Sequence, residues 1–125
     1  MNEEYDFMSF VNIITRNDSL INVDMDDISR LINGCDTLTY CVGFADGNYK
    51  GAKAGQIAAR LLGKENKYTG VLLHVTGGPN LSLYEAKEAT SQIMDICVPD
   101  ADLIIGIRID KNYNEKIRLD VIGVN

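Results

Sequence analysis

Residues 70–89 read GVLLHVTGGPNLSLYEAKEA, and this stretch decides which fold the sequence predicts. Residues 70–76 form a nearly continuous apolar run, which is typical of a strand buried on both faces of a sheet. Two glycines follow, and Ser82 then precedes Glu85 by three residues, the spacing of a capping box at the start of a helix. The stretch therefore predicts a buried strand, a tight turn and a helix in immediate succession.

The segments on either side continue this alternation of strands and helices. Strands are predicted where β-branched and aromatic residues gather or where apolar and polar residues alternate, and helices where apolar residues recur every three or four positions. The predicted strands are 37–44, 70–76, 102–109 and 116–124, and the helices between them are 52–62 and a second one from Ser82 to Pro99, which closes it.

The order of these elements predicts an α/β fold with two layers. The β-α-β units are expected to be right-handed crossovers between parallel strands, and the short turn before the last strand predicts a C-terminal antiparallel hairpin. The expected architecture is a four-stranded mixed sheet with helices packed on it. Ile117, Leu119 and Val121 alternate with Arg118 and Asp120, so the last strand is expected to have one wetter face.

Two further helices are predicted before the first strand. Apolar residues recur at helical spacing through 5–16. In the segment 20–32, LINVDMDDISRLI, Asp24 is placed to cap a helix, and Asp26 and Asp27 would lie in its first turn, where acids favour the helix dipole.

Composition narrows the class of protein. The chain has 125 residues, enough for one domain with a real core, and a net charge of −6 with a pI of about 4.6. The basic residues form no cluster, which argues against nucleic acid as a partner and against direct membrane binding. No stretch is long and apolar enough to predict a transmembrane helix, and the acidic N-terminus does not resemble a signal peptide.

Cysteine and histidine usage argues against a metal centre. Cys35, Cys41 and Cys97 show no metal-ligand spacing, and three free thiols are typical of a reducing compartment. His74 is the single histidine and falls in the middle of a predicted strand, so a core or edge position is expected for it rather than a catalytic one.

Three segments together resemble FtsZ, the tubulin-like cell-division GTPase. Residues 20–32 are similar to the Leu-Ile-Asn-x-Asp-x-x-Asp loop at the end of that family's long central helix, and residues 70–89 match its Thr-Gly-Gly segment. Residues 99–124, PDADLIIGIRIDKNYNEKIRLDVIGV, are similar to the family's closing segment. The resemblance implies that residues 1–19 are the end of the central helix and residues 20–125 an FtsZ C-terminal-like domain.

The resemblance also implies where chemistry occurs. In FtsZ filaments this acidic loop completes the GTPase site of the neighbouring subunit, so Asp24 and Asp27 would activate the attacking water and Asn22 would position the loop. GTP and a cation would lie at the interface with an FtsZ-type nucleotide-binding domain. The family's Gly-rich phosphate loop is absent from this sequence, so the chain alone is expected to bind no cofactor and to have no activity. Self-assembly in filaments and a cytoplasmic location, at the division site in the parent protein, are further expectations.

Other interpretations of the same residues stay open. The aspartates at 24–27 are also common helix caps, and the chain is also compatible with a stand-alone relative that regulates or caps filaments without enzymatic activity. The turn TGGPNLS, residues 76–82, offers backbone amides to a phosphate, although a tight strand-to-helix turn explains the same glycines. The sequence departs from the family at Lys50 and Gly51, which occupy the positions of an Arg-Ala pair.

Overall fold

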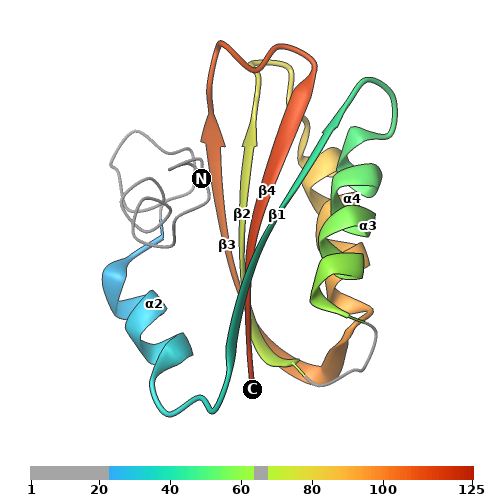
Figure 1. The fold of residues 1–125 in the computed structure, drawn as a ribbon. Helices are drawn as coiled ribbons and strands as arrows, with labels where there is room; N and C mark the ends of the chain where they lie inside the picture. Colours follow the sequence, from blue (N-terminus) through green and yellow to red (C-terminus); the bar gives the residue numbers. More distant parts are fainter. Residues whose placement is uncertain (1–22, 64–67) are drawn as a thin grey trace, which may run out of the picture.

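The computed structural model describes residues 23–63 and 68–125, so the helix expected over 5–16 lies outside the described residues. Helices and strands alternate as far as β3, and a second strand, β4, follows it directly (Figure 1). Their bounds are α2 (Met25–Ile32), β1 (Leu38–Asp46), α3 (Lys50–Leu62), β2 (Tyr68–Gly77), α4 (Leu83–Met94), β3 (Cys97–Ile109) and β4 (Lys116–Val124).

The four strands form one mixed sheet in the order β1-β4-β2-β3. β2 and β3 are parallel, and β4 is antiparallel to both of its neighbours, β1 and β2. The predicted mixed α/β sheet is confirmed, but the predicted C-terminal hairpin is wrong, because β4 crosses over β2 instead of pairing with β3. Burial explains this order: β4 is buried along all but its first residue and takes a central place, whereas the partly exposed β3 lies at an edge.

α3 and α4 cover one face of the sheet, where the larger hydrophobic cluster lies. The two helices approach so closely that a Cβ on Gly51 would lie 2.2 Å from the carbonyl oxygen of Glu85. Ala54 and Ala58, on the inner side of α3, are fully buried. Glycine and alanine therefore permit the close packing of the helical layer on the strands.

α2 lies on the opposite face of the sheet, so the helices do not all pack on one side (Figure 1). Its Ile28 belongs to a second cluster with Leu72 of β2 and Ile122 of β4. The expectation that β4 has one wetter face is wrong, because Arg118 is only 6% exposed and Asp120 only 3%. Their charges are buried as a pair rather than solvated.

The end of α4 also differs from the expectation. The helix ends at Met94 and β3 begins at Cys97, so Pro99 lies inside a strand and does not close the helix. Proline lacks the N–H that a central strand needs, and an edge strand such as β3 tolerates it. Within residues 23–63 and 68–125, every helix is too short or too polar to cross a bilayer.

Candidate functional site

The acidic turn, Asp24 to Asp27, begins α2 as the sequence predicts. The Asp24 carboxylate accepts a hydrogen bond from the Asp26 N–H at 3.0 Å. The Asp24 carbonyl accepts from the amides of Asp27 at 3.0 Å and Ile28 at 3.2 Å. Asp24 and Asp26 are exposed and Asp27 is partly exposed, while Asn22 lies outside the described residues.

Apolar residues anchor this turn on the sheet. Val23 is 3% exposed and Ile28 is 2% exposed, and both pack in the cluster that includes Leu72, Ile122 and Val124. The residues before and after the aspartates are therefore held against β2 and β4, while the carboxylates face away from the core. A rigid backbone that presents exposed acids is the arrangement that a contact with another molecule requires.

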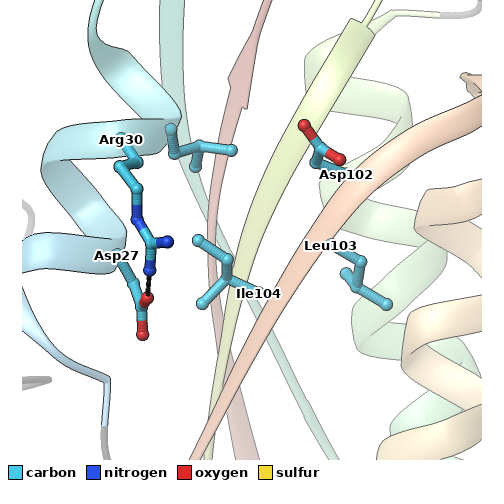
Figure 2. A pocket seen from close by; sticks show the side chains of 6 residues that line it. Asp27, Arg30, Asp102, Leu103 and Ile104 are labelled. Atoms are coloured by element: carbon cyan, nitrogen blue, oxygen red, sulfur yellow. Dashed lines mark hydrogen bonds and ion pairs between the residues drawn. The ribbon is translucent and has the colours of Figure 1, made fainter.

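Asp27 forms an ion pair with Arg30 on the same helix (Figure 2). The Arg30 side chain is 77% exposed and that of Asp27 38%. An exposed pair of this kind contributes only about 0–1 kcal/mol, because water and salt screen it. Arg30 can therefore leave Asp27 at little cost when another charged group approaches.

A cavity of about 320 Å³ separates the acidic turn from the edge strand β3 (Figure 2). Its lining residues are Asp27, Arg30 and Leu31 of α2 and Asp102, Leu103 and Ile104 of β3. Carboxylates on both walls accept hydrogen bonds from water but repel a phosphate. In the part of the chain that the structure describes, no three histidine, cysteine or acidic side chains are grouped to hold a metal ion.

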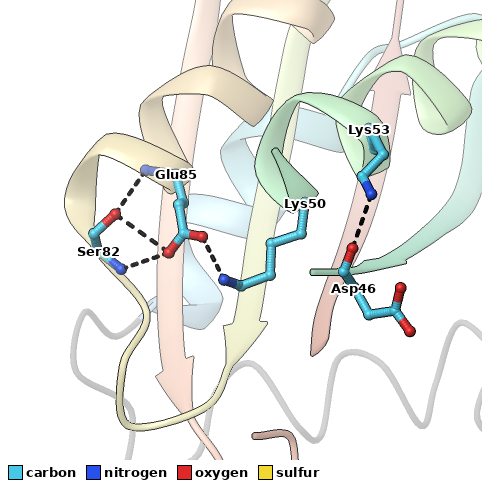
Figure 3. A network of polar contacts seen from close by, with 5 residues as sticks. All are labelled: Asp46, Lys50, Lys53, Ser82 and Glu85. Carbon is cyan, nitrogen blue, oxygen red and sulfur yellow. Dashed lines mark hydrogen bonds and ion pairs between the residues drawn. The ribbon is translucent and has the colours of Figure 1, made fainter. Parts of the chain in front are cut away.

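The TGGPNLS turn is filled by the protein's own groups, which argues against a phosphate site there. A Cβ on Gly78 would lie 2.3 Å from the carbonyl oxygen of Asn114, so the turn is packed against the β3–β4 connection. Ser82 and Glu85 form the predicted capping box, with the Glu85 carboxylate 3.0 Å from the Ser82 amide (Figure 3). That carboxylate occupies the end of α4 where an anion would bind.

Lys50 is a buried charge that the sequence did not reveal. It is 6% exposed and forms an ion pair with Glu85, which joins the first residue of α3 to the cap of α4 (Figure 3). Burial opposes the charge on Glu85, but Lys50 and Ser82 outweigh it and hold the pKa of the Glu85 carboxyl below its ordinary value of 4.5. The one sequence signal was the departure from the family pattern at Lys50 and Gly51.

A second polar cluster lies on the sheet face that carries α2. The Arg118 guanidinium donates to both carboxylate oxygens of Asp120, at 2.9 and 3.1 Å, and the Tyr40 hydroxyl donates to Asp120 at 2.6 Å. Burial, assisted by Arg108 and Arg118, lowers the pKa of His74 to about 4, so this histidine is neutral at pH 7. A buried neutral histidine fits the core position expected for it.

Comparison with known proteins identifies the family. The model of the FtsZ family, C-terminal domain, matches residues 38–125, a span that starts after the acidic turn. A cell division protein FtsZ from Magnetospirillum gryphiswaldense is 32% identical over 108 residues, which cover 83% of this chain and 19% of the relative. Cell division protein FtsZ 1 from Methanocaldococcus jannaschii is 32% identical over 112 residues, which cover 87% of this chain and 30% of the relative.

Solved structures extend the similarity to the whole chain. A point mutant of M. jannaschii FtsZ has a TM-score of 0.79 at 25% identity, with 100% of this chain and 42% of that chain covered. An empty FtsZ dimer from M. jannaschii gives 0.77 at 25% identity, with 100% of this chain and 40% of that chain covered. TubZ from Bacillus thuringiensis serovar israelensis, in GDP-form protofilaments, shares the fold with a TM-score of 0.70 at 14% identity, covering 94% of this chain and 33% of that chain.

Proposed function

Since this chain belongs to the FtsZ family through its C-terminal domain, we propose that its acidic turn completes the GTPase site of a neighbouring FtsZ-type subunit. The observation that carries the proposal is the placement of Asp24 and Asp27 outside the core, on a turn that Val23 and Ile28 fix to the sheet. The chain spans less than a third of the length of the two curated FtsZ relatives it matches. In this proposal the nucleotide lies on the neighbouring subunit.

The chemistry needs a water molecule in line with the γ-phosphorus and positive charge to offset what develops on the phosphate oxygens. Asp24 and Asp27 would orient or deprotonate that water, and Asn22 would position the turn. The partner would supply GTP, its cation and the phosphate-binding loop. Among the described residues, the exposed Arg30 is the one cation that forms an ion pair with the turn.

The partner in this proposal is the nucleotide-binding domain of another FtsZ-type subunit, in a self-assembled filament. Residues 1–19 would be the end of the central helix and residues 20–125 the domain that docks. The net charge of −6 favours neither nucleic acid nor an anionic membrane as a partner. The proposed location is the cytoplasm, at the division site of the parent protein.

A second candidate is a regulator that caps filaments without supporting hydrolysis. The ion pair between Asp27 and Arg30 favours this alternative, because a carboxylate engaged by a guanidinium is not free to accept a hydrogen bond from the attacking water. Both candidates require binding to a neighbouring subunit. They differ in whether the acids accelerate hydrolysis after binding.

A rescue experiment in trans separates them. M. jannaschii FtsZ 1, with alanine at the two positions aligned with Asp24 and Asp27, would keep a nucleotide pocket and lack the acids. Adding the wild-type 125-residue chain should raise its GTP turnover by roughly 100-fold, the scale of positioned acid-base catalysis. Chains with Asp27→Asn or Asp24→Asn should bind without this gain.

The rescue experiment needs a control variant that removes a carboxylate outside the acidic turn. Asp95→Asn, exposed at the C-terminal end of α4 on the other face of the sheet, is the matched control and should rescue turnover like the wild type. Equal rescue by Asp27→Asn would overturn the catalytic assignment. Binding of the wild-type chain without any rise in turnover would favour the capping role.

A further inference from the structure

The connection from α2 to β1 contains the one Asn-Gly dipeptide of the sequence, Asn33 followed by Gly34. Both residues are exposed, and the connection lies at one end of the sheet (Figure 1). Asn33 is the C-cap of α2, and Gly34 has a φ of 77°, in the left-handed region. A Cβ at Gly34 would meet no atom within 4 Å, so water has access to this turn.

The peptide unit between Asn33 and Gly34 forms no hydrogen bond to another described residue. The hydrogen bonds of this turn belong to the amides on either side. The Asn33 N–H donates to the Ser29 carbonyl at 2.9 Å, and the Cys35 N–H donates to the Ile32 carbonyl at 3.3 Å. The Asn33 carbonyl and the Gly34 N–H, which make up the peptide unit itself, are therefore held by solvent alone within the described part of the chain.

The chain offers an internal comparison at Asp46 and Gly47, the other place where a glycine follows an Asn or Asp. These two residues are also exposed, and Gly47 has a similar φ of 71°. Their peptide unit, however, is held at both ends. The Gly47 N–H donates to the Glu115 carbonyl at 3.1 Å, and the Lys53 ammonium donates to the Asp46 carbonyl at 2.9 Å. The two turns therefore differ in how freely the peptide unit can rotate.

We propose, independently of any role of the acidic turn, that Asn33 and Gly34 form a site of spontaneous deamidation that loosens the end of α2. The Gly34 nitrogen loses its proton to solvent and attacks Cγ of Asn33, and Nδ2 leaves as ammonia, which closes a succinimide ring. Water then opens the ring. Attack at Cγ gives aspartate, whereas attack at the backbone carbonyl carbon gives isoaspartate, in which the chain continues through the side chain. One water is consumed and one ammonia is released, with no oxidation or reduction.

The geometry of the turn favours each step of this reaction. Glycine has no Cβ to hinder the approach of its nitrogen to the Asn33 side chain. The attack requires rotation about the Asn33 Cα–C bond, where ψ is 124°, and this rotation breaks no hydrogen bond of the Asn33–Gly34 peptide unit. The product places a carboxylate at the C-terminal end of α2, where the helix dipole already concentrates negative charge. The last turn of α2 should therefore open more easily after deamidation.

The test follows the purified 125-residue chain at mildly alkaline pH, folded and unfolded in guanidinium chloride. Peptide mapping by mass spectrometry locates the replacement of NH by O, and an isoaspartyl-specific methyltransferase reports isoaspartate. Asn33 in the folded chain should react within about 10-fold of its rate in the unfolded chain, since local opening of an exposed, unbonded turn costs little. Asp46 should form isoaspartate at least about 10-fold more slowly when folded, because two hydrogen bonds must break. Asn33→Gln, which would need a larger ring, is the matched control and should not react.

The outcomes separate the site from its effect on α2. Rapid deamidation of Asn33 in the folded chain, with Asp46 protected, supports the site, and protection of Asn33 as strong as that of Asp46 would overturn it. Anion exchange separates the product, which carries an additional negative charge. In this product the Cys35 amide should exchange its hydrogen several-fold faster than in the unmodified chain. Unchanged exchange at Cys35 would overturn the effect on α2.

Discussion

The ion pair between Lys50 and Glu85 should respond very differently to the loss of each partner. The Lys50 side chain is 7% exposed and that of Glu85 22%. Glu85→Gln strands a buried ammonium without its counter-charge, and removing one partner of a buried pair costs about 3–5 kcal/mol. Lys50→Met removes the buried charge and keeps an apolar stem, so we expect a loss of about 1–2 kcal/mol from the hydrogen bond alone.

The double variant tests this reasoning. With Lys50→Met already in place, Glu85→Gln strands nothing, so the double variant should have nearly the stability of Lys50→Met. The coupling between the two sites would then be about 3–5 kcal/mol, the whole cost of Glu85→Gln in the wild-type background. Urea unfolding followed by far-ultraviolet circular dichroism gives the four free energies of unfolding. Losses that are equal for the two single variants and additive in the double variant would refute the account.

The same pair predicts a dependence of stability on pH. Burial acts against the charge of Glu85, but Lys50 and Ser82 hold the pKa of its carboxyl below 4.5 in the folded state. The unfolded chain takes up the proton first as the pH falls, so the stabilisation is present above this range and is lost below it. Glu85→Gln should lack this acid-dependent loss.

Three further perturbations test the fold around the site. Gly51→Ala should lower the free energy of unfolding in urea by about 1–3 kcal/mol, because the new methyl group would meet the Glu85 carbonyl. Gln56→Ala, at an exposed position on the same helix, is the control and should leave the free energy of unfolding unchanged. Burial lowers the pKa of His74 to about 4, so between pH 6.5 and 4 this histidine is protonated mainly in the unfolded chain. The free energy of unfolding should therefore fall by about 3 kcal/mol as the pH drops from 6.5 to 4. His74→Asn should remove this dependence of stability on pH. Burial and a neighbouring carboxylate raise the pKa of the Cys41 thiol to about 12. In a variant without the other two cysteines, alkylation of Cys41 should therefore be slow at pH 8 and accelerate only as the pH approaches 12. Rapid alkylation at pH 8 would contradict the burial of the Cys41 thiol.

Local signals in the sequence were the most reliable. The cap at Asp24 and the capping box of Ser82 and Glu85 were predictable because each depends on hydrogen bonds that span two or three residues. The strand order was not, because β4 pairs with β1 and β2 across long stretches of chain. A short connection from β3 to β4 suggested a hairpin, and burial of β4 at the centre of the sheet overrode it.

Buried charges were the main gap in the prediction of the site. In the sequence, Arg118 and Asp120 alternate with apolar residues as they would on a solvated strand face, and nothing local distinguishes the two cases. Lys50 likewise gave no sign of burial, because it falls in a polar segment just before the predicted helix 52–62. The helix start itself was predictable, because Asp24 is a typical cap and Asp26 and Asp27 follow it in the first turn. The catalytic roles of Asp24 and Asp27 stay predictions.

The central claim is that this acidic turn enters the nucleotide pocket of another molecule. The most direct measurement is a structure of the 125-residue chain bound to M. jannaschii FtsZ 1 loaded with a non-hydrolysable GTP analogue. The account predicts the Asp24 or Asp27 carboxylate about 3 Å from a water in line with the γ-phosphorus, with Arg30 moved away from Asp27. A complex in which both carboxylates face solvent, far from the nucleotide, would contradict it.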